Sequence, residues 1–101
     1  MIQMTDERKR EIFKIVARCF IEKFSPIDLG EVSELQGGYL VSTTDGRSSA
    51  WGTISRVGWH TTVSISSVVK IRGELAQDPA TTRRYGVSTT ASGEICAVRL
   101  S

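Results

Sequence analysis

Apolar and charged positions at the start of the chain repeat with the period of an α-helix. The apolar residues that gather on one wide side of this helix are Ile12, Phe13, Ile15, Val16, Ala17, Cys19, Phe20 and Phe24. Thr5 suits the N-cap position, and Ser25-Pro26 ends the helix because the residue before a proline is forced out of the α region. The pattern predicts an amphipathic helix over residues 5–24, broad enough on its apolar side to lie on a sheet.

Beyond Pro26 the chain carries the pattern of β-strands. Serine, threonine and β-branched residues are dense there, and these residue types favour extended backbone. Five strands are predicted, over residues 38–44, 47–56, 59–72, 84–90 and 94–100, with a shorter extended piece at 31–35. Tight turns are expected at Asp45-Gly46, Val57-Gly58 and Ser92-Gly93, so neighbouring strands should be antiparallel. The longer connection, 73–82, has room for a helical turn.

The third predicted strand alternates most clearly between two faces. The apolar residues of its first face are Val63, Ile65, Val69 and Ile71. Trp59 shares their parity and is expected to close the core, whereas His60 is expected on the solvent face. The predicted fold is therefore α+β, one domain over 1–101, with the N-terminal helix packed on a curled antiparallel sheet of about five strands. In architecture alone, this arrangement is similar to cystatin-like and NTF2-like rolls.

Two short segments of the predicted sheet resemble each other. Residues 39–44 (YLVSTT) and 85–90 (YGVSTT) agree at five of six positions, and each precedes a predicted turn. Either the segments form equivalent hairpins related by pseudo-symmetry, or they match by chance because strands and turns draw on few residue types.

Composition and the chain ends indicate the class and compartment of the protein. A chain of 101 residues with 40% hydrophobic and 24% charged residues suits one folded domain. There is no secretory signal, and no apolar run approaches the roughly 20 residues that span a bilayer. We expect a cytoplasmic location, no membrane partner, and reduced Cys19 and Cys96 buried in the core. The first and last residues are typical of a complete short reading frame, as in accessory proteins of mobile elements.

Few groups are available for catalysis or for binding a metal. One histidine and two cysteines exclude most zinc sites, and neither a glycine-rich phosphate loop nor a nucleophile elbow occurs. We therefore predict no metal, no cofactor and no catalytic residue. His60 is the one side chain with acid–base chemistry near neutral pH. It has no acid in its strand to orient the ring, which favours an exposed polar residue over a general base.

Charge is unevenly distributed, although the formal net charge is only +2. Residues 46–73 contain four basic residues and no acidic one. Lys70 and Arg72 share the solvent face of their predicted strand with His60, and an exposed Trp51 would add a surface for stacking. The predicted binding residues are His60, Arg56, Lys70, Arg72 and Trp51.

These features favour a noncatalytic binding or assembly module over two alternatives. Its hydroxyl-rich, locally basic sheet face would bind a protein partner, a second copy in a homodimer, or a small anionic ligand. The first alternative is a small enzyme with a pocket between helix and sheet. The residues whose meeting would support it are His60 or Tyr39 with Asp28, Glu31 or Glu34. The second is nucleic-acid binding through the basic region 46–84, which the small total charge makes less favoured.

Overall fold

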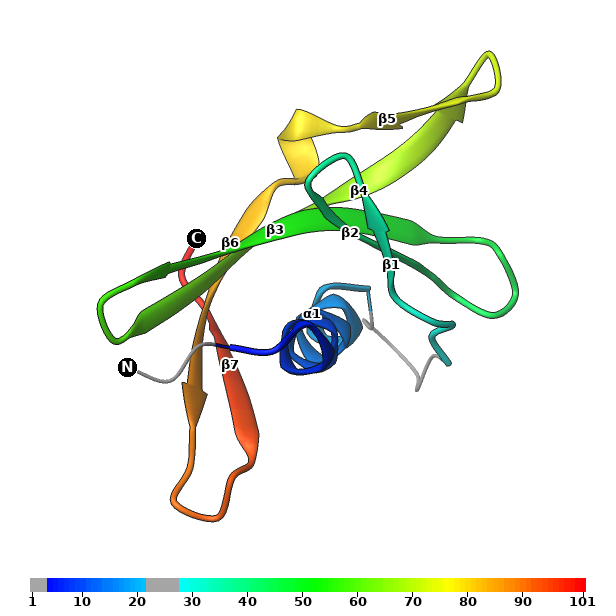
Figure 1. Ribbon diagram of the computed structural model, residues 1–101. Coiled ribbons are helices and arrows are strands. Elements are labelled where there is room, and N and C mark those ends of the chain that lie inside the picture. The colour runs from blue at the N-terminus through cyan, green and yellow to red at the C-terminus, as the bar shows by residue number, and fades with distance from the viewer. Residues whose placement is uncertain (1–3, 22–27) are drawn as a thin grey trace.

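The computed structural model of the chain describes residues 4–21 and 28–101, which form one helix beside an antiparallel sheet (Figure 1). The elements in chain order are α1 (Asp6–Ile21), β1 (Ser33–Leu35), β2 (Gly38–Ser42), β3 (Ser49–Val57), β4 (His60–Ile71), β5 (Glu74–Gln77), the 3₁₀ turn η1 (Pro79–Thr81), β6 (Arg83–Thr89) and β7 (Ile95–Arg99). The predicted α+β class is confirmed, with seven described strands rather than about five.

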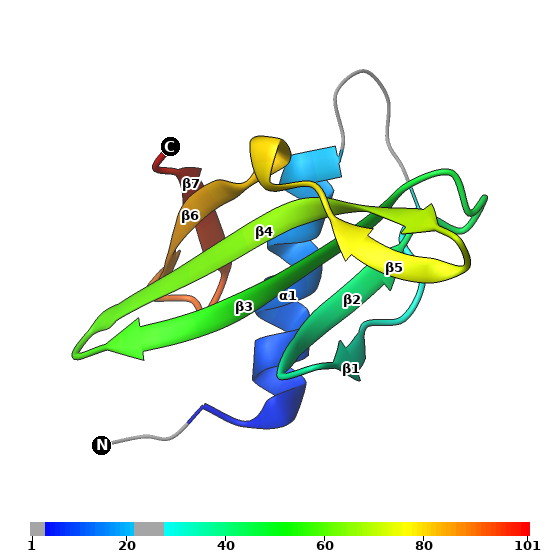
Figure 2. The same ribbon diagram turned by 90° about the horizontal axis from the view of Figure 1, so that it is seen from above.

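Most strands lie side by side in the order β1-β2-β3-β4-β6-β7, and all neighbours are antiparallel. β6 pairs with the first half of β4, where Ile65 lies opposite Arg83. β5 pairs with the second half, where Val68 lies opposite Gln77, and η1 separates β5 from β6. The β4–β5 hairpin therefore leaves the rest of the sheet and extends away from α1 (Figures 1 and 2).

The start of α1 agrees with the sequence-based prediction. The backbone N–H of Arg8 donates to Thr5 Oγ1 at 3.1 Å, so Thr5 is the N-cap. The predicted helix end at Ser25-Pro26 lies outside the described residues, as does Phe24.

α1 covers one face of the sheet and buries its apolar side there (Figure 2). The buried apolar residues are Ile12, Phe13, Val16, Ala17, Leu29, Val32, Tyr39, Val41, Ala50, Val63, Ile65 and Tyr85. The rings of Phe13 and Tyr39 pack with their centroids 5.7 Å apart. Gly52 lies beneath Phe13, and a Cβ at this position would overlap the carbonyl oxygen of Ser64. The absence of a side chain at Gly52 thus lets the helix approach the sheet closely.

The two strands beyond the predicted five come from the short extended piece predicted at 31–35 and from the connection predicted at 73–82. β1 lies within 31–35, and 73–82 contains β5 followed by η1, the expected helical turn, which Asp78 caps. The hairpin turns at Gln36-Gly37 and Arg72-Gly73 have positive φ at both positions, 51° and 78° in the first and 54° and 83° in the second. These are type I′ turns without the Asn-Gly or Asp-Gly signal that makes such turns recognisable.

The three predicted turns occur with shifted boundaries. Asp45-Gly46 and Ser92-Gly93 lie within the longer β2–β3 and β6–β7 loops, whereas the β3–β4 turn is Gly58-Trp59 rather than Val57-Gly58. Only Gly58 has a positive φ in that turn, 61°. The shift moves Trp59 out of the strand, and its side chain is 90% exposed. The prediction that Trp59 closes the core is therefore wrong, because strand parity does not extend into a turn.

Several side chains that were expected in the core are exposed. Cys19 and Cys96 are both exposed free thiols. Cys19 lies beyond the edge of the buried stripe of α1, and Cys96 faces away from α1 because its neighbour Ala97 packs toward the core. Val69 and Ile71 are 47% and 57% exposed, since β4 continues past the part of the sheet that α1 covers.

The two matched sequence segments take equivalent places in the sheet. β2 and β6 flank the β3–β4 hairpin on opposite sides, where Tyr39 pairs with Gly52 and Tyr85 with Val63. Both tyrosines are buried on the face that α1 covers. This register relates the segments by an approximate two-fold axis through the hairpin, which supports pseudo-symmetry over a chance match.

Candidate functional site

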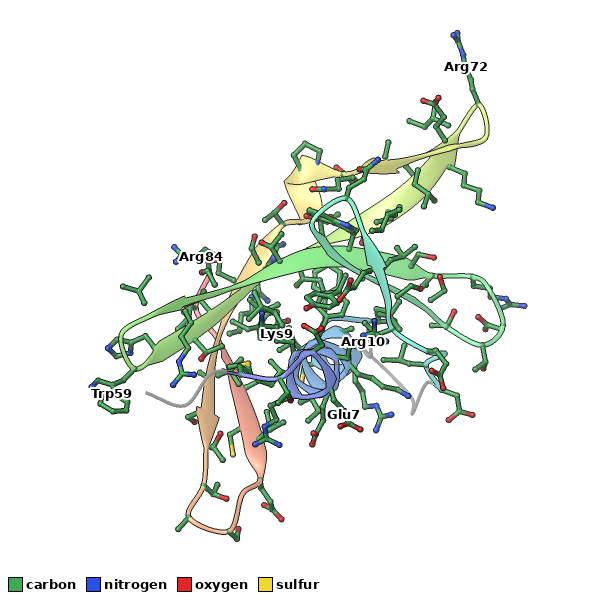
Figure 3. The ribbon with its side chains drawn as sticks, viewed as in Figure 1. Glu7, Lys9, Arg10, Trp59, Arg72 and Arg84 are labelled. Carbon is green, nitrogen blue, oxygen red and sulfur yellow. The ribbon has the colours of Figure 1, made fainter. Side chains whose placement is uncertain are left out.

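The predicted binding residues of β3 and β4 lie at two ends of the sheet rather than in one place. Arg56 and His60 adjoin the β3–β4 turn, whereas Lys70 and Arg72 lie at the other end of β4. Because a strand rises about 3.3 Å per residue, about 33 Å of β4 separates His60 from Lys70. Trp59, next to His60, and Arg72 mark opposite ends of the molecule in Figure 3. A small ligand therefore cannot contact both groups of cations.

Trp51 lies on the sheet face opposite α1, where it is half-buried and fixed in position. Its Nε1 donates to the carbonyl oxygen of Leu35 at 2.9 Å. The indole also lies over Gly38, where a Cβ would overlap it. A groove of about 230 Å³ runs beside it, lined by Leu35, Gln36, Leu40, Trp51, Val68, Leu75 and Gln77. Trp51 thus forms one wall of a small groove that is separate from the cations and is lined by apolar side chains and two glutamines.

A larger hollow opens where the end of the β3–β4 hairpin, β6, β7 and the start of α1 meet. It has a volume of about 1100 Å³ and is lined by Met4, Thr5, Arg8, Ile12, Arg56, Trp59, His60, Thr61, Thr62, Gly86, Val87, Ser88, Thr89, Val98 and Leu100. We call it the Trp59 hollow. It forms because β6 pairs with β4 only as far as Thr61 opposite Val87, and beyond this pair the β3–β4 and β6–β7 hairpins diverge (Figure 1). Of the predicted binding residues, Arg56 and His60 line the hollow, from opposite faces of the hairpin end.

Basic groups dominate the electrostatics of the Trp59 hollow. Arg8, Arg56 and His60 line it, and no residue of its described lining is acidic. The Arg8 guanidinium lies 3.3 Å from a carboxylate oxygen of Glu11 and donates to the Gly93 carbonyl at 3.4 Å. The Arg8–Glu11 pair is exposed, and such pairs contribute about 0–1 kcal/mol. Arg8 can therefore exchange Glu11 for an anionic ligand at small cost.

Two lining residues of the hollow were missed or misplaced from the sequence. Arg8 belongs to the basic run Arg8-Lys9-Arg10, which could contact phosphate but is more typical of a solvated helix end, and no local spacing relates it to Arg56. Trp59 was assigned to the core, although a glycine at the first position of a two-residue turn, here Gly58, is a known hairpin signal. Reading that signal one residue later would have placed Trp59 in solvent.

A small hollow at the β1–β2 turn brings together one pair of groups that an enzyme would need. It has a volume of about 380 Å³, and both Glu34 and Tyr39 line it. Burial, followed by the negative charges of Glu34 and Asp6, raises the pKa of Tyr39 above 10.0, while Arg10 opposes this shift. Arg10 also lies 3.7 Å from a Glu34 carboxylate oxygen. The Tyr39 hydroxyl thus stays protonated at neutral pH and can donate a hydrogen bond but cannot act as a base.

Metal sites, membrane spans and similarity to known proteins provide no further lead. Across residues 4–21 and 28–101, no three histidine, cysteine, aspartate or glutamate side chains lie together as metal ligands. No helix in that described part is long and apolar enough to cross a membrane. No family model, curated protein or solved structure matches the chain. The functional inference therefore depends on the chemistry of the hollows.

Proposed function

We propose that this chain is a noncatalytic binding module that takes a small anionic ligand in the Trp59 hollow. The proposal rests on Arg8, Arg56 and His60, which come from three different elements and line one hollow without an acidic residue in its described lining. Arginine presents planar sets of donors that match carboxylate and phosphate groups, and the hydroxyls of β4 and β6 add further donors. A volume of about 1100 Å³ suits a ligand of metabolite size.

Titration of the ¹⁵N-labelled protein with inorganic phosphate, followed by NMR, tests this proposal. The backbone amide signals of Gly58, His60 and Ser88 should shift in a saturable manner, since these residues border or line the hollow. Arg56→Gln should weaken phosphate binding about tenfold, because it removes a charge-assisted hydrogen bond.

Arg72→Gln is the matched control, because it removes the same charge from the opposite end of β4. It should bind phosphate as the wild type does. If both variants weaken binding equally, only the overall charge matters and the proposed site is wrong. A wild-type titration without saturable shifts at these amides would also contradict it.

A second candidate function, docking of a protein partner or of a second copy, is favoured by the Trp51 groove. The groove lies on the sheet face that α1 leaves uncovered, and two of its apolar lining residues, Trp51 and Leu75, are half-buried and 43% exposed, respectively. Buried tryptophans often dominate the energy of protein interfaces. Sedimentation over micromolar concentrations tests for a homodimer. If the protein is a monomer at every concentration, the homodimer is excluded. Trp51→Phe should weaken any dimer that uses the groove.

The enzyme and nucleic-acid alternatives have direct tests of their own. A curled roll of the cystatin-like or NTF2-like kind would provide an enzyme pocket, for which the Tyr39 and Glu34 hollow is the candidate. If an activity is found and is unchanged in both the His60→Ala and the Tyr39→Phe variants, neither side chain takes part in it and the predicted enzyme pocket is excluded.

Nucleic-acid binding depends on contacts to phosphates and must weaken steeply as salt is added. If the protein fails to retard DNA or RNA in a gel at low salt, this alternative is excluded.

A further inference from the structure

Trp59 gives the hollow a feature that binding of a simple anion does not need. Its side chain is 90% exposed in the Gly58-Trp59 turn, directly beside His60. Exposed tryptophan rings at binding sites gain stability by stacking on flat partners, and every nucleobase presents such a face. The position of Trp59 at the rim of a basic hollow therefore indicates a ligand with both a planar ring and an anionic group.

The rest of the lining matches the parts of such a ligand. Hydroxyl groups of Thr61 and Thr89, on the sheet face that α1 covers, can bond to a sugar, and Arg8 and Arg56 on the same side can hold a phosphate. The hollow is also far larger than inorganic phosphate requires, at about 1100 Å³. Resting on the proposed function, we propose that the Trp59 hollow binds a nucleoside 5′-phosphate, with its base on Trp59 and its phosphate on the two arginines.

The distribution of charge favours a free nucleotide over a nucleic-acid strand. A single strand needs a continuous positive groove along its backbone. Between His60 and Lys70, the same face of β4 carries Thr62, Ser64, Ser66 and Val68 and no cation. In the neighbouring strand β6, Arg84 opposite Ser64 adds a single positive charge to this face, which does not make a continuous groove. The ligand is therefore confined to the hollow at one end of the sheet.

Calorimetric titration with adenosine 5′-monophosphate, ribose 5-phosphate and adenosine tests this inference. The nucleotide should bind about tenfold more tightly than ribose 5-phosphate, because only the nucleotide can stack on Trp59. Trp59→Leu should abolish that advantage and leave the affinity for ribose 5-phosphate unchanged. The variant should fold normally, since the Trp59 side chain is 90% exposed.

Ile71→Ala, which shortens an exposed apolar side chain at the opposite end of β4, is the control and should retain the nucleotide advantage. If the nucleotide binds no more tightly than ribose 5-phosphate, the inference is overturned while the proposed anion site stands. If no phosphorylated ligand binds, both are overturned. A short single-stranded DNA that binds more tightly than the mononucleotide would overturn the assignment of a free nucleotide.

Discussion

Single residues hold the loops of this protein where the hydrophobic core does not reach. The Asp45 carboxylate in the β2–β3 loop accepts hydrogen bonds from Thr43 Oγ1 at 2.6 Å and from the Arg47 backbone N–H at 3.0 Å. These bonds, the Thr43 bond foremost, lower the pKa of Asp45 below its ordinary value of 3.8. Because the pKa is lower in the folded state, the charged carboxylate stabilises that state above about pH 3.8. This stabilisation is lost as the pH falls through the folded-state pKa.

Asp45→Asn should therefore lower the Tm at neutral pH, and the difference from wild type should close in acid. Circular dichroism melts between neutral pH and the acid limit of folding measure this. Arg47→Gln keeps the backbone donor to Asp45 and removes only the weaker contribution of the exposed Arg47 guanidinium, so it should retain most of the wild-type pH dependence. A difference that stays constant down to the lowest pH would contradict the assigned role of the charge.

Two strand glycines should respond in opposite ways to the same substitution. A Cβ at Gly52 would lie 3.0 Å from the Phe13 ring and overlap the Ser64 carbonyl, whereas one at Gly86 would make an ordinary 3.5 Å contact with Leu100. Gly52→Ala should cost about 1–3 kcal/mol of unfolding free energy through overpacking. Gly86→Ala should be neutral or stabilise by up to about 1 kcal/mol. Urea unfolding measures both, and equal effects would show that Gly52 is not a close-approach position.

At the scale of elements, the β4–β5 hairpin differs from the rest of the sheet. Its apolar residues Val69, Ile71 and Leu75 are 47%, 57% and 43% exposed, and α1 does not cover it. An isolated two-stranded hairpin is only marginally stable in water. We therefore expect this hairpin to open locally while the six-stranded part of the sheet stays closed.

Hydrogen exchange should separate these two parts of β4. Amides of 69–76 should exchange faster than those of 61–65, which pair on both sides. Arg72→Asn creates an Asn-Gly type I′ turn at a position with φ of 54°, so it should slow exchange in 69–76 alone. Uniform exchange along β4 would show that the hairpin is not an independent unit.

At the scale of the whole molecule, stability depends on one contact layer between α1 and the sheet. Phe13, Val16 and Ala17 are fully buried there, and Phe13 packs on Tyr39 of β2. The Trp59 hollow depends on the same docking, because α1 contributes Arg8 to it. Loss of this layer should therefore unfold the sheet and, at the same time, separate Arg8 from the residues of the sheet that line the hollow.

Phe13→Ala should lower the free energy of unfolding by about 3–5 kcal/mol. Trp59→Ala should change it by no more than about 0.5 kcal/mol, because that side chain makes few contacts. Urea unfolding followed by circular dichroism gives both values. Similar costs for the two variants would mean that the α1 layer is not what stabilises the fold.

Prediction from the sequence succeeded where structure depends on near neighbours. The N-cap at Thr5, the apolar side of α1 and most strand positions follow from side chains one to four positions apart. It failed at Gln36-Gly37 and Arg72-Gly73, whose type I′ turns are held by strand pairing rather than by favoured turn residues. It also failed at Trp59, because a one-residue shift in a turn changes what a side chain faces.

The sequence by itself determined the α+β class, the buried side of the helix and a basic segment without acids, because periodicity and composition are local properties. Only the tertiary structure decided which charges share a site. Arg8 lines the same hollow as Arg56 and His60 because of where α1 crosses the sheet and where β6 stops pairing with β4. Lys70 and Arg72 are not part of this site because they lie at the opposite end of β4 from His60. Strand register and helix docking are long-range properties, and no short stretch of sequence specifies them.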